Sequence, residues 1–159
     1  MAEQFIKFGK GGFRFDDWRF INRLILRYDI KTVLEYGCGI STELLVCSGM
    51  TVTSLETQEQ WAAAYLGDNR FNVILCNYSN GYPELNKKYD LGFIDGPGAA
   101  EISDRSKSVL HAKQRCSFIY LHDFNLNQFE HLDRDENWVR CTVPGKHKSH
   151  FYALRNKLI

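Results

Sequence analysis

The sequence lacks the features that mark secreted, membrane-spanning and nucleic-acid-binding proteins. Its 20 basic and 19 acidic residues leave a formal net charge of +1, so no global field attracts nucleic acid or an anionic membrane. No run approaches the roughly 18 apolar residues of a membrane span, and residues 1–10 contain no apolar signal segment. Five cysteines without a C-x-x-C pair favour free thiols in a reducing compartment over a disulfide scaffold or a zinc ribbon. We therefore expect a soluble, cytoplasmic protein without a nucleic-acid or membrane partner.

The chain also shows no internal repeat, low-complexity tract or linker. Its 159 residues suit one domain and are enough to bury a core. We divide it into residues 1–31, an N-terminal extension and helix interpreted as a lid or acceptor-side segment, and residues 32–159, the main domain. The aromatic residues Phe13, Phe15 and Trp18 fit either a lid over a bound ligand or a hydrophobic staple for the first helix.

Short apolar runs alternate with helical segments along most of the chain. Strands are expected at residues 32–36, 51–55, 72–76, 90–94 and 117–121, followed by a hairpin of 138–143 and 149–154. Helices are expected at about 16–28, 41–48, 57–66, 102–113 and 125–132, the third with Thr57 as N-cap and Gln60 completing a capping box. Continuous apolar strands are typical of a sheet covered on both faces. The fold class predicted is α/β: a Rossmann-like, doubly wound, mostly parallel seven-stranded sheet with an antiparallel last strand.

One stretch, TVLEYGCGIST at residues 32–42, organises the rest. An apolar run reaches the acid Glu35, then two glycines, Gly37 and Gly39, and then Ser41 and Thr42, which can cap a helix. Glycines permit positive φ and let a ligand approach the main chain closely. The stretch predicts a strand, a tight turn and a helix start with bare backbone for a ligand.

Polar groups also follow the other predicted parallel strands. In an open doubly wound sheet, ligands bind outside the carboxyl ends of the strands. Here five consecutive strand ends carry polar groups, which are Glu35-Tyr36-Gly37, Glu56, Asn77-Tyr78, Asp95-Gly96 and His122-Asp123. We expect this set to form one site.

The pattern over about residues 32–154 resembles the class I S-adenosylmethionine-dependent methyltransferases. The most specific elements are the loop from Glu35 to Thr42, similar to the family's acid-x-Gly-x-Gly-x-Ser/Thr loop, and Glu56, 17 positions after Gly39. The resemblance implies that Glu56 accepts both ribose hydroxyls and that Asn77 and Tyr78 lie near the adenine. The residues expected to bind S-adenosylmethionine, or its product S-adenosylhomocysteine, are Glu35, Tyr36, Gly37, Cys38, Gly39, Ser41, Thr42, Glu56, Asn77, Tyr78 and Asp95.

The segment Ile94-Asp95-Gly96-Pro97 bears on the chemistry. It lacks the Asn/Asp-Pro-Pro-aromatic tetrad of amino-group methyltransferases and resembles the small-molecule O-methyltransferase branch, which implies a small acceptor methylated on oxygen. Hydroxyl methylation needs a base or a charge-stabilised alkoxide close to the methyl donor. The candidate catalytic residues are His122 and Asp95, with His122 preferred as base because an unperturbed imidazole titrates near pH ~6.5.

The same branch can hold a divalent metal on this Asp and a later one, here Asp95 and Asp123. In that branch an Asn normally follows directly, whereas here Phe124 does, and Asn125 comes one residue later. The remaining histidines have no metal-ligand spacing. We therefore predict no metal ligands, and a divalent metal is the weaker alternative.

Two other functions compete with methyl transfer. A dinucleotide-binding fingerprint would make the protein an NAD-dependent oxidoreductase, but it requires a third small residue where Thr42 stands, and Glu35 is not part of it. A catalytically silent cofactor-binding or interaction module is the stronger alternative, because no insertion or added domain is evident that would shape an acceptor pocket. The sequence does not predict an oligomeric state.

Overall fold

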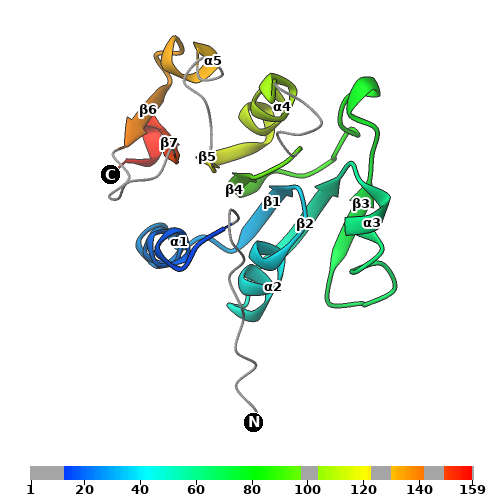
Figure 1. Ribbon diagram of the computed structural model, residues 1–159. Helices are drawn as coiled ribbons and strands as arrows, with labels where there is room; N and C mark the ends of the chain where they lie inside the picture. Colours follow the sequence, from blue (N-terminus) through cyan, green and yellow to red (C-terminus); the bar gives the residue numbers. More distant parts are fainter. Residues whose placement is uncertain (1–12, 98–103, 123–129, 142–148, 159) are drawn as a thin grey trace.

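The computed structural model describes residues 13–97, 104–122, 130–141 and 149–158 (Figure 1). Its strands are β1 Thr32–Tyr36, β2 Thr51–Glu56, β3 Asn72–Leu75, β4 Tyr89–Ile94, β5 Cys116–Leu121, β6 Trp138–Cys141 and β7 His150–Leu154. Its helices are α1 Phe15–Tyr28, α2 Ile40–Cys47, α3 Glu59–Ala62, α4 Ser106–Arg115 and α5 Glu130–Asp133, with short 3₁₀ turns η1 Tyr78–Asn80 and η3 Arg155–Lys157.

The strands form one seven-stranded sheet in the order β3-β2-β1-β4-β5-β7-β6. Strands β1 to β5 run parallel, and β7 pairs antiparallel with both β5 and β6. The predicted α/β class and the antiparallel last strand are confirmed. The hairpin does not simply extend the sheet in chain order, because β7 lies between β5 and β6.

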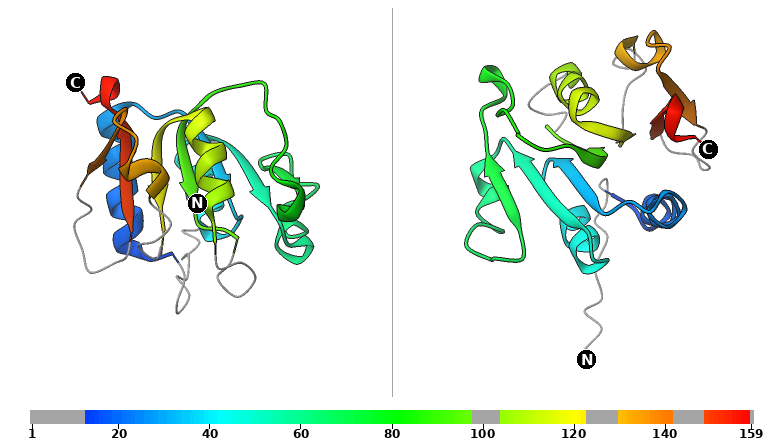
Figure 2. Two further views of the ribbon diagram at one scale, coloured as in Figure 1. Left: turned by 90° about the horizontal axis from the view of Figure 1, so that it is seen from above. Right: turned by 180° about the vertical axis from the view of Figure 1, so that it is seen from behind.

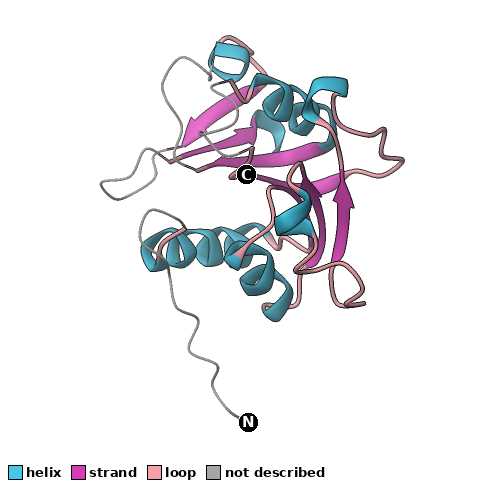
Figure 3. Ribbon diagram, turned by 45° about the vertical axis from the view of Figure 1, so that its right-hand side comes forward, coloured by secondary structure: helices cyan, strands magenta, loops and turns pink. Residues whose placement is uncertain are grey.

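Helices cover both faces of the sheet (Figures 2 and 3). The buried cluster on one face includes Ile21 and Leu24 from α1 and Leu45 from α2, and the cluster on the other includes Val109 from α4 and Leu132 from α5. Neighbouring residues of one strand face opposite layers, so β1 contributes Val33 to the first cluster and Leu34 to the second. This two-sided burial explains the continuous apolar strands.

The third helix is shorter than predicted. It was expected over residues 57–66 with Thr57 as N-cap, but α3 spans Glu59–Ala62 and Gln58 takes the N-cap position without a side-chain cap. The carboxylate of Glu56 instead accepts the backbone N–H groups of Thr57 and Gln58 at 2.7 and 2.8 Å. It thus satisfies donors that a capping side chain would otherwise serve.

Two further predicted helices extend into residues outside the described part. Helix α4 starts at Ser106, where the Asp104 carboxylate accepts the Ser106 N–H at 2.8 Å, and residues 98–103 lie outside the described part. Of the helix expected at 125–132, the structure describes only residues from 130 onward, where α5 spans Glu130–Asp133. None of the helices described is long and apolar enough to cross a membrane.

Candidate functional site

The first glycine of the loop is required by the protein's own geometry. Gly37 has φ +90°, and a Cβ built on it would lie 3.0 Å from the backbone of Gly96. Two backbone hydrogen bonds hold this close approach. The Gly96 N–H donates to the Tyr36 carbonyl at 2.6 Å, and the Gly37 N–H donates to the Leu55 carbonyl at 2.8 Å. The ends of β1, β2 and β4 are therefore joined through this turn.

The second glycine differs from the first in its backbone conformation. Gly39 has φ 173°, an extended conformation open to any residue, so the positive φ that a glycine permits is adopted at Gly37 and not here. A Cβ built on Gly39 would meet no described atom within 4 Å. Nothing among the described residues demands glycine there, so the space beside it is open to a ligand.

Alanine substitutions should separate the two glycines. We expect Gly37→Ala to lower the free energy of unfolding by about 2–3 kcal/mol, because it combines a positive φ with a close backbone contact. Gly39→Ala should change it by less than ~1 kcal/mol, since the added methyl group meets open space. Urea unfolding followed by circular dichroism measures both, and equal losses for the two variants would contradict this assignment.

Glu35 lies beneath the loop and has no exposed surface. Its carboxylate accepts hydrogen bonds from Ser41 and Thr42 at 2.6 Å each and from Ser54 at 2.5 Å. The Thr42 hydroxyl also accepts the Gly39 N–H at 2.9 Å. Burial raises the pKa of Glu35 to about 7 against the lowering effect of the three hydroxyls. This carboxyl group therefore holds the first turn of α2 against β1 and β2.

Glu56 joins the end of β2 to the glycine loop. One carboxylate oxygen accepts the Cys38 N–H at 2.8 Å and lies 3.4 Å from the Cys38 thiol, while the other accepts the two N–H groups at the start of α3. Burial and the Glu56 charge raise the pKa of the Cys38 thiol well above its ordinary value. Cys38 is therefore a neutral neighbour of the loop and not a nucleophile.

Tyr36, Ser41 and Thr42 were predicted to contact the cofactor, yet their side chains are buried within the protein. The Tyr36 ring points into the layer of α4, where its hydroxyl lies 2.8 Å from Nδ1 of His111. Burial lowers the pKa of His111, which is consistent with a neutral ring in this position. In this structure the Ser41 and Thr42 side chains support the loop, and the Tyr36 ring belongs to the core beneath α4.

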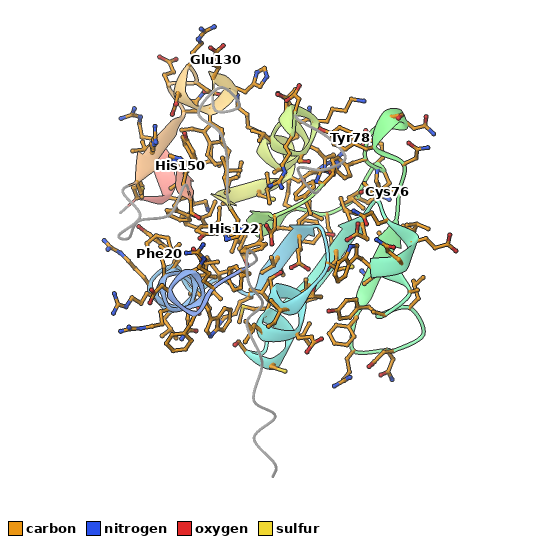
Figure 4. All side chains as sticks on the ribbon, viewed as in Figure 1. Phe20, Cys76, Tyr78, His122, Glu130 and His150 are labelled. Carbon is orange, nitrogen blue, oxygen red and sulfur yellow. The ribbon has the colours of Figure 1, made fainter. Side chains whose placement is uncertain are left out.

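Asn77 and Tyr78 follow β3, and Tyr78 is labelled in Figure 4. Asn77 is exposed and its side-chain oxygen accepts the Ser79 N–H at 2.9 Å. The Tyr78 hydroxyl donates to the Asp104 carbonyl at 2.7 Å, and the Lys107 ammonium lies 5.2 Å from the centre of the Tyr78 ring. The turn after β3 is thus attached to the start of α4, and the adenine contact stays a prediction.

The two candidate catalytic residues lie in direct contact. Nδ1 of His122, at the end of β5, is 2.8 Å from a carboxylate oxygen of Asp95, at the end of β4. Nε2 of the same ring is 3.3 Å from a carboxylate oxygen of Asp17 in α1. His122 is 2% exposed, whereas the Asp95 side chain is 30% exposed. The imidazole is therefore enclosed between two carboxylates, and Asp95 is the member of the group that solvent reaches.

Asp17 is a site residue that sequence reasoning missed, because the sequence places it only at the start of the first predicted helix, far from the strand ends. It does cap α1, accepting the Arg14 N–H at 3.0 Å, and it also accepts the Tyr120 hydroxyl at 3.1 Å. Burial acts to raise its pKa, but hydrogen bonding to His122, the His122 charge and the other two donors outweigh it, so the pKa is lowered. One signal was present: Asp17 stands four residues before Ile21, on the apolar stripe of the helix.

Arg105 was also missed. It is buried just before α4, where Nε donates to the Pro97 carbonyl at 2.6 Å and Nη1 donates to the His122 carbonyl at 3.2 Å. The guanidinium thus joins the segments that follow β4 and β5. Phe13 packs edge-on against the His122 ring, with 5.6 Å between ring centres, while Phe15 is 57% exposed.

The alternative that the protein holds a divalent metal would involve Asp95 and Asp123. Asp123, with Phe124 and Asn125, lies outside the described residues. Within the part of the chain that is described, no three His, Cys, Asp or Glu residues form a group that could hold a metal ion.

Comparisons with known proteins bear on the fold. No protein-family model matches the chain, and no curated protein matches it by sequence. An O-methyltransferase from Bacillus cereus in complex with S-adenosylhomocysteine shares 16% identity over 92% of this chain and 83% of its own, with a TM-score of 0.67. A Podospora anserina methyltransferase bound to S-adenosylhomocysteine shares 15% identity over 88% and 77%, with a TM-score of 0.66.

A 16S ribosomal RNA guanine-N2 methyltransferase from T. thermophilus, solved with S-adenosylmethionine and guanosine, is also similar. It shares 15% identity over 93% of this chain and 45% of its own, with a TM-score of 0.64. At such identities the similarity establishes the fold, which is that of the class I S-adenosylmethionine-dependent methyltransferases. Because proteins with this fold methylate either oxygen or nitrogen, the acceptor does not follow from it.

Proposed function

We propose that this protein, which has the methyltransferase fold, binds S-adenosylmethionine and transfers its methyl group to an oxygen of a small acceptor. The observation that carries the proposal is the Glu56 carboxylate, which joins the end of β2 to the Cys38 N–H inside the glycine loop. It lies at the carboxyl edge of the parallel strands, where this fold class binds ligands. A Cβ built on Gly39 would meet no described atom within 4 Å, which leaves the backbone there accessible to a ligand.

The polar groups at this edge suit the ribose of a nucleoside. A carboxylate at the position of Glu56 can accept two vicinal hydroxyls, and the bare backbone at Gly39 permits close approach. The bound cofactor would supply an electrophilic methyl group. The protein's own residues then have to orient the acceptor, exclude water and accept a proton.

Geometry gives Asp95 and His122 different proposed roles. Both ring nitrogens of His122 already face carboxylates, so the ring is poorly placed to take a further proton from an acceptor. Asp95 bonds His122 through Oδ1, and within the described residues Oδ2 has no hydrogen-bond partner. We therefore assign Asp95 as the group that receives the acceptor hydroxyl proton, with His122 as its partner. Support for oxygen as the acceptor atom comes from the Asp95-Gly96-Pro97 segment, which resembles the small-molecule O-methyltransferases in sequence.

Isothermal titration with S-adenosylhomocysteine tests the cofactor half of the proposal. We expect a dissociation constant in the micromolar range and a rise in melting temperature, because a ligand that binds only the folded state stabilises it. The absence of both heat and a thermal shift would refute it. A parallel titration with NADH addresses the oxidoreductase alternative, for which we expect no binding.

Methyl transfer is tested with labelled S-adenosylmethionine and a panel of small hydroxyl compounds. The proposal expects label in at least one compound and its loss in Asp95→Asn. Cofactor binding without transfer to any compound, together with full cofactor affinity in Asp95→Asn, would instead favour the catalytically silent module.

A further inference from the structure

The environment of His122 defines its hydrogen-bonding state. Asp17 and Asp95 face opposite ring nitrogens at 3.3 and 2.8 Å, and an ionised carboxylate can only accept hydrogen bonds. Each nitrogen must therefore carry a proton for both contacts to be hydrogen bonds, which makes the ring an imidazolium. A neutral ring would leave one nitrogen lone pair against a carboxylate in a buried site, which is unfavourable.

The remaining neighbours restrain this arrangement without replacing it. Phe13 covers one side of the ring, and Arg105 bonds the His122 carbonyl rather than the imidazole. The Tyr120 hydroxyl bonds Asp17, and the buried Glu35 lies near enough to Asp95 for their charges to interact. The two aspartates are thus the acidic groups that touch the ring among the described residues.

Asp17 is held in position from two directions. One of its oxygens bonds the Arg14 N–H at the first turn of α1, and the other bonds the Tyr120 hydroxyl on β5. Both Asp17 and Tyr120 are buried, so turning either carboxylate oxygen away would leave a buried polar group without a hydrogen-bond partner. The direction of the Asp17–His122 contact is therefore fixed by the packing of α1 on the sheet.

We propose that Asp17 is a positioning residue: it holds His122 as an imidazolium whose Nδ1–H is directed at Oδ1 of Asp95. This keeps Oδ2 of Asp95 directed toward the acceptor, and in that respect the inference rests on the proposed function. It also makes the first turn of α1 part of the active site, although α1 precedes the glycine loop in the chain. The arrangement follows the rule that a group bonded to one histidine nitrogen sets what the other nitrogen can do.

Imidazole NMR spectra of the whole protein test the inference without cofactor or acceptor. We expect the wild-type His122 ring at pH 7 to show two protonated nitrogens and two slowly exchanging N–H signals. Asp17→Asn should abolish that pattern, because one carboxylate is lost from the ring. The matched control is Asp16→Asn, which removes the same charge from an exposed neighbour in the same helical turn and should leave the spectrum unchanged.

Three results would overturn the inference. They are a singly protonated His122 ring in the wild type at pH 7, a wild-type spectrum in folded Asp17→Asn, and equal effects of the two substitutions. The first requires no variant, so the inference stays testable if Asp17→Asn fails to fold. The outcome is also distinct from that of the proposed function, since a protein that binds no S-adenosylhomocysteine can still show the imidazolium pattern.

Discussion

Glu56→Gln is expected to weaken S-adenosylhomocysteine binding about 100-fold or more while the protein stays folded. The substitution keeps the shape of the side chain but replaces one acceptor oxygen by an N–H donor. In one orientation that donor faces the Cys38 N–H, and in the other it faces the N–H groups at the start of α3. The first orientation breaks the link between β2 and the glycine loop, and the second breaks the bonds that hold the start of α3, so neither orientation keeps the wild-type geometry.

The magnitude follows from the hydrogen bonds that a carboxylate would make to two ribose hydroxyls. Bonds to a charged group contribute about 1.5–3 kcal/mol each, and ~1.4 kcal/mol corresponds to a tenfold change in affinity. Isothermal titration measures the loss, with Glu59→Gln, on the exposed side of α3, as matched control. Wild-type affinity in a folded E56Q protein would remove Glu56 from the ligand site.

A second large effect is expected from Glu35, through the pH dependence of stability. Its pKa is about 7 in the folded protein against an ordinary value of 4.5. Between these values the folded state keeps a proton that the unfolded state releases, so its stabilising contribution is complete below pH ~4.5 and is lost as the pH rises through ~7. The contribution lost approaches about 3 kcal/mol of unfolding free energy.

Urea unfolding at several pH values between 4 and 8 isolates this contribution when the wild type is compared with Glu35→Gln. The comparison is necessary because burial lowers the pKa of His111 and His150, which makes stability rise with pH over part of the same range. We expect the wild type minus variant difference to fall as the pH rises. A difference that is constant across the range would show that Glu35 titrates alike in the folded and unfolded states.

Most of the fold could be predicted from local patterns. The apolar runs of β1 to β5 and the apolar stripe of α1 are visible in the local sequence. Parallel strands then bring Tyr36, Ile94 and Leu121 to one edge of the sheet. The start of α3 was less predictable. There the Glu56 carboxylate, a group outside the helix, satisfies the backbone donors that a capping motif would have served.

The site could be predicted only where it follows the chain locally. The glycine loop and the acids at the strand ends are visible in sequence, whereas the Asp17–His122 contact joins residues that are 105 positions apart. Burial of Ser41, Thr42 and Tyr36 was equally invisible, because it depends on Glu35 and His111 approaching from other elements. Such contacts are set by packing, and a local pattern does not encode them.

The position of β7 has a consequence for how the protein folds. Strand β6 precedes β7 in the chain, but among the described strands it is bonded to the sheet through β7 alone. It cannot join the sheet until β7 has paired with β5, and that pairing spans a long stretch of chain and carries the larger entropic cost. Strand β6 is therefore attached to the sheet after β7, or together with it as a preformed hairpin, and not in the order in which the two strands are synthesised.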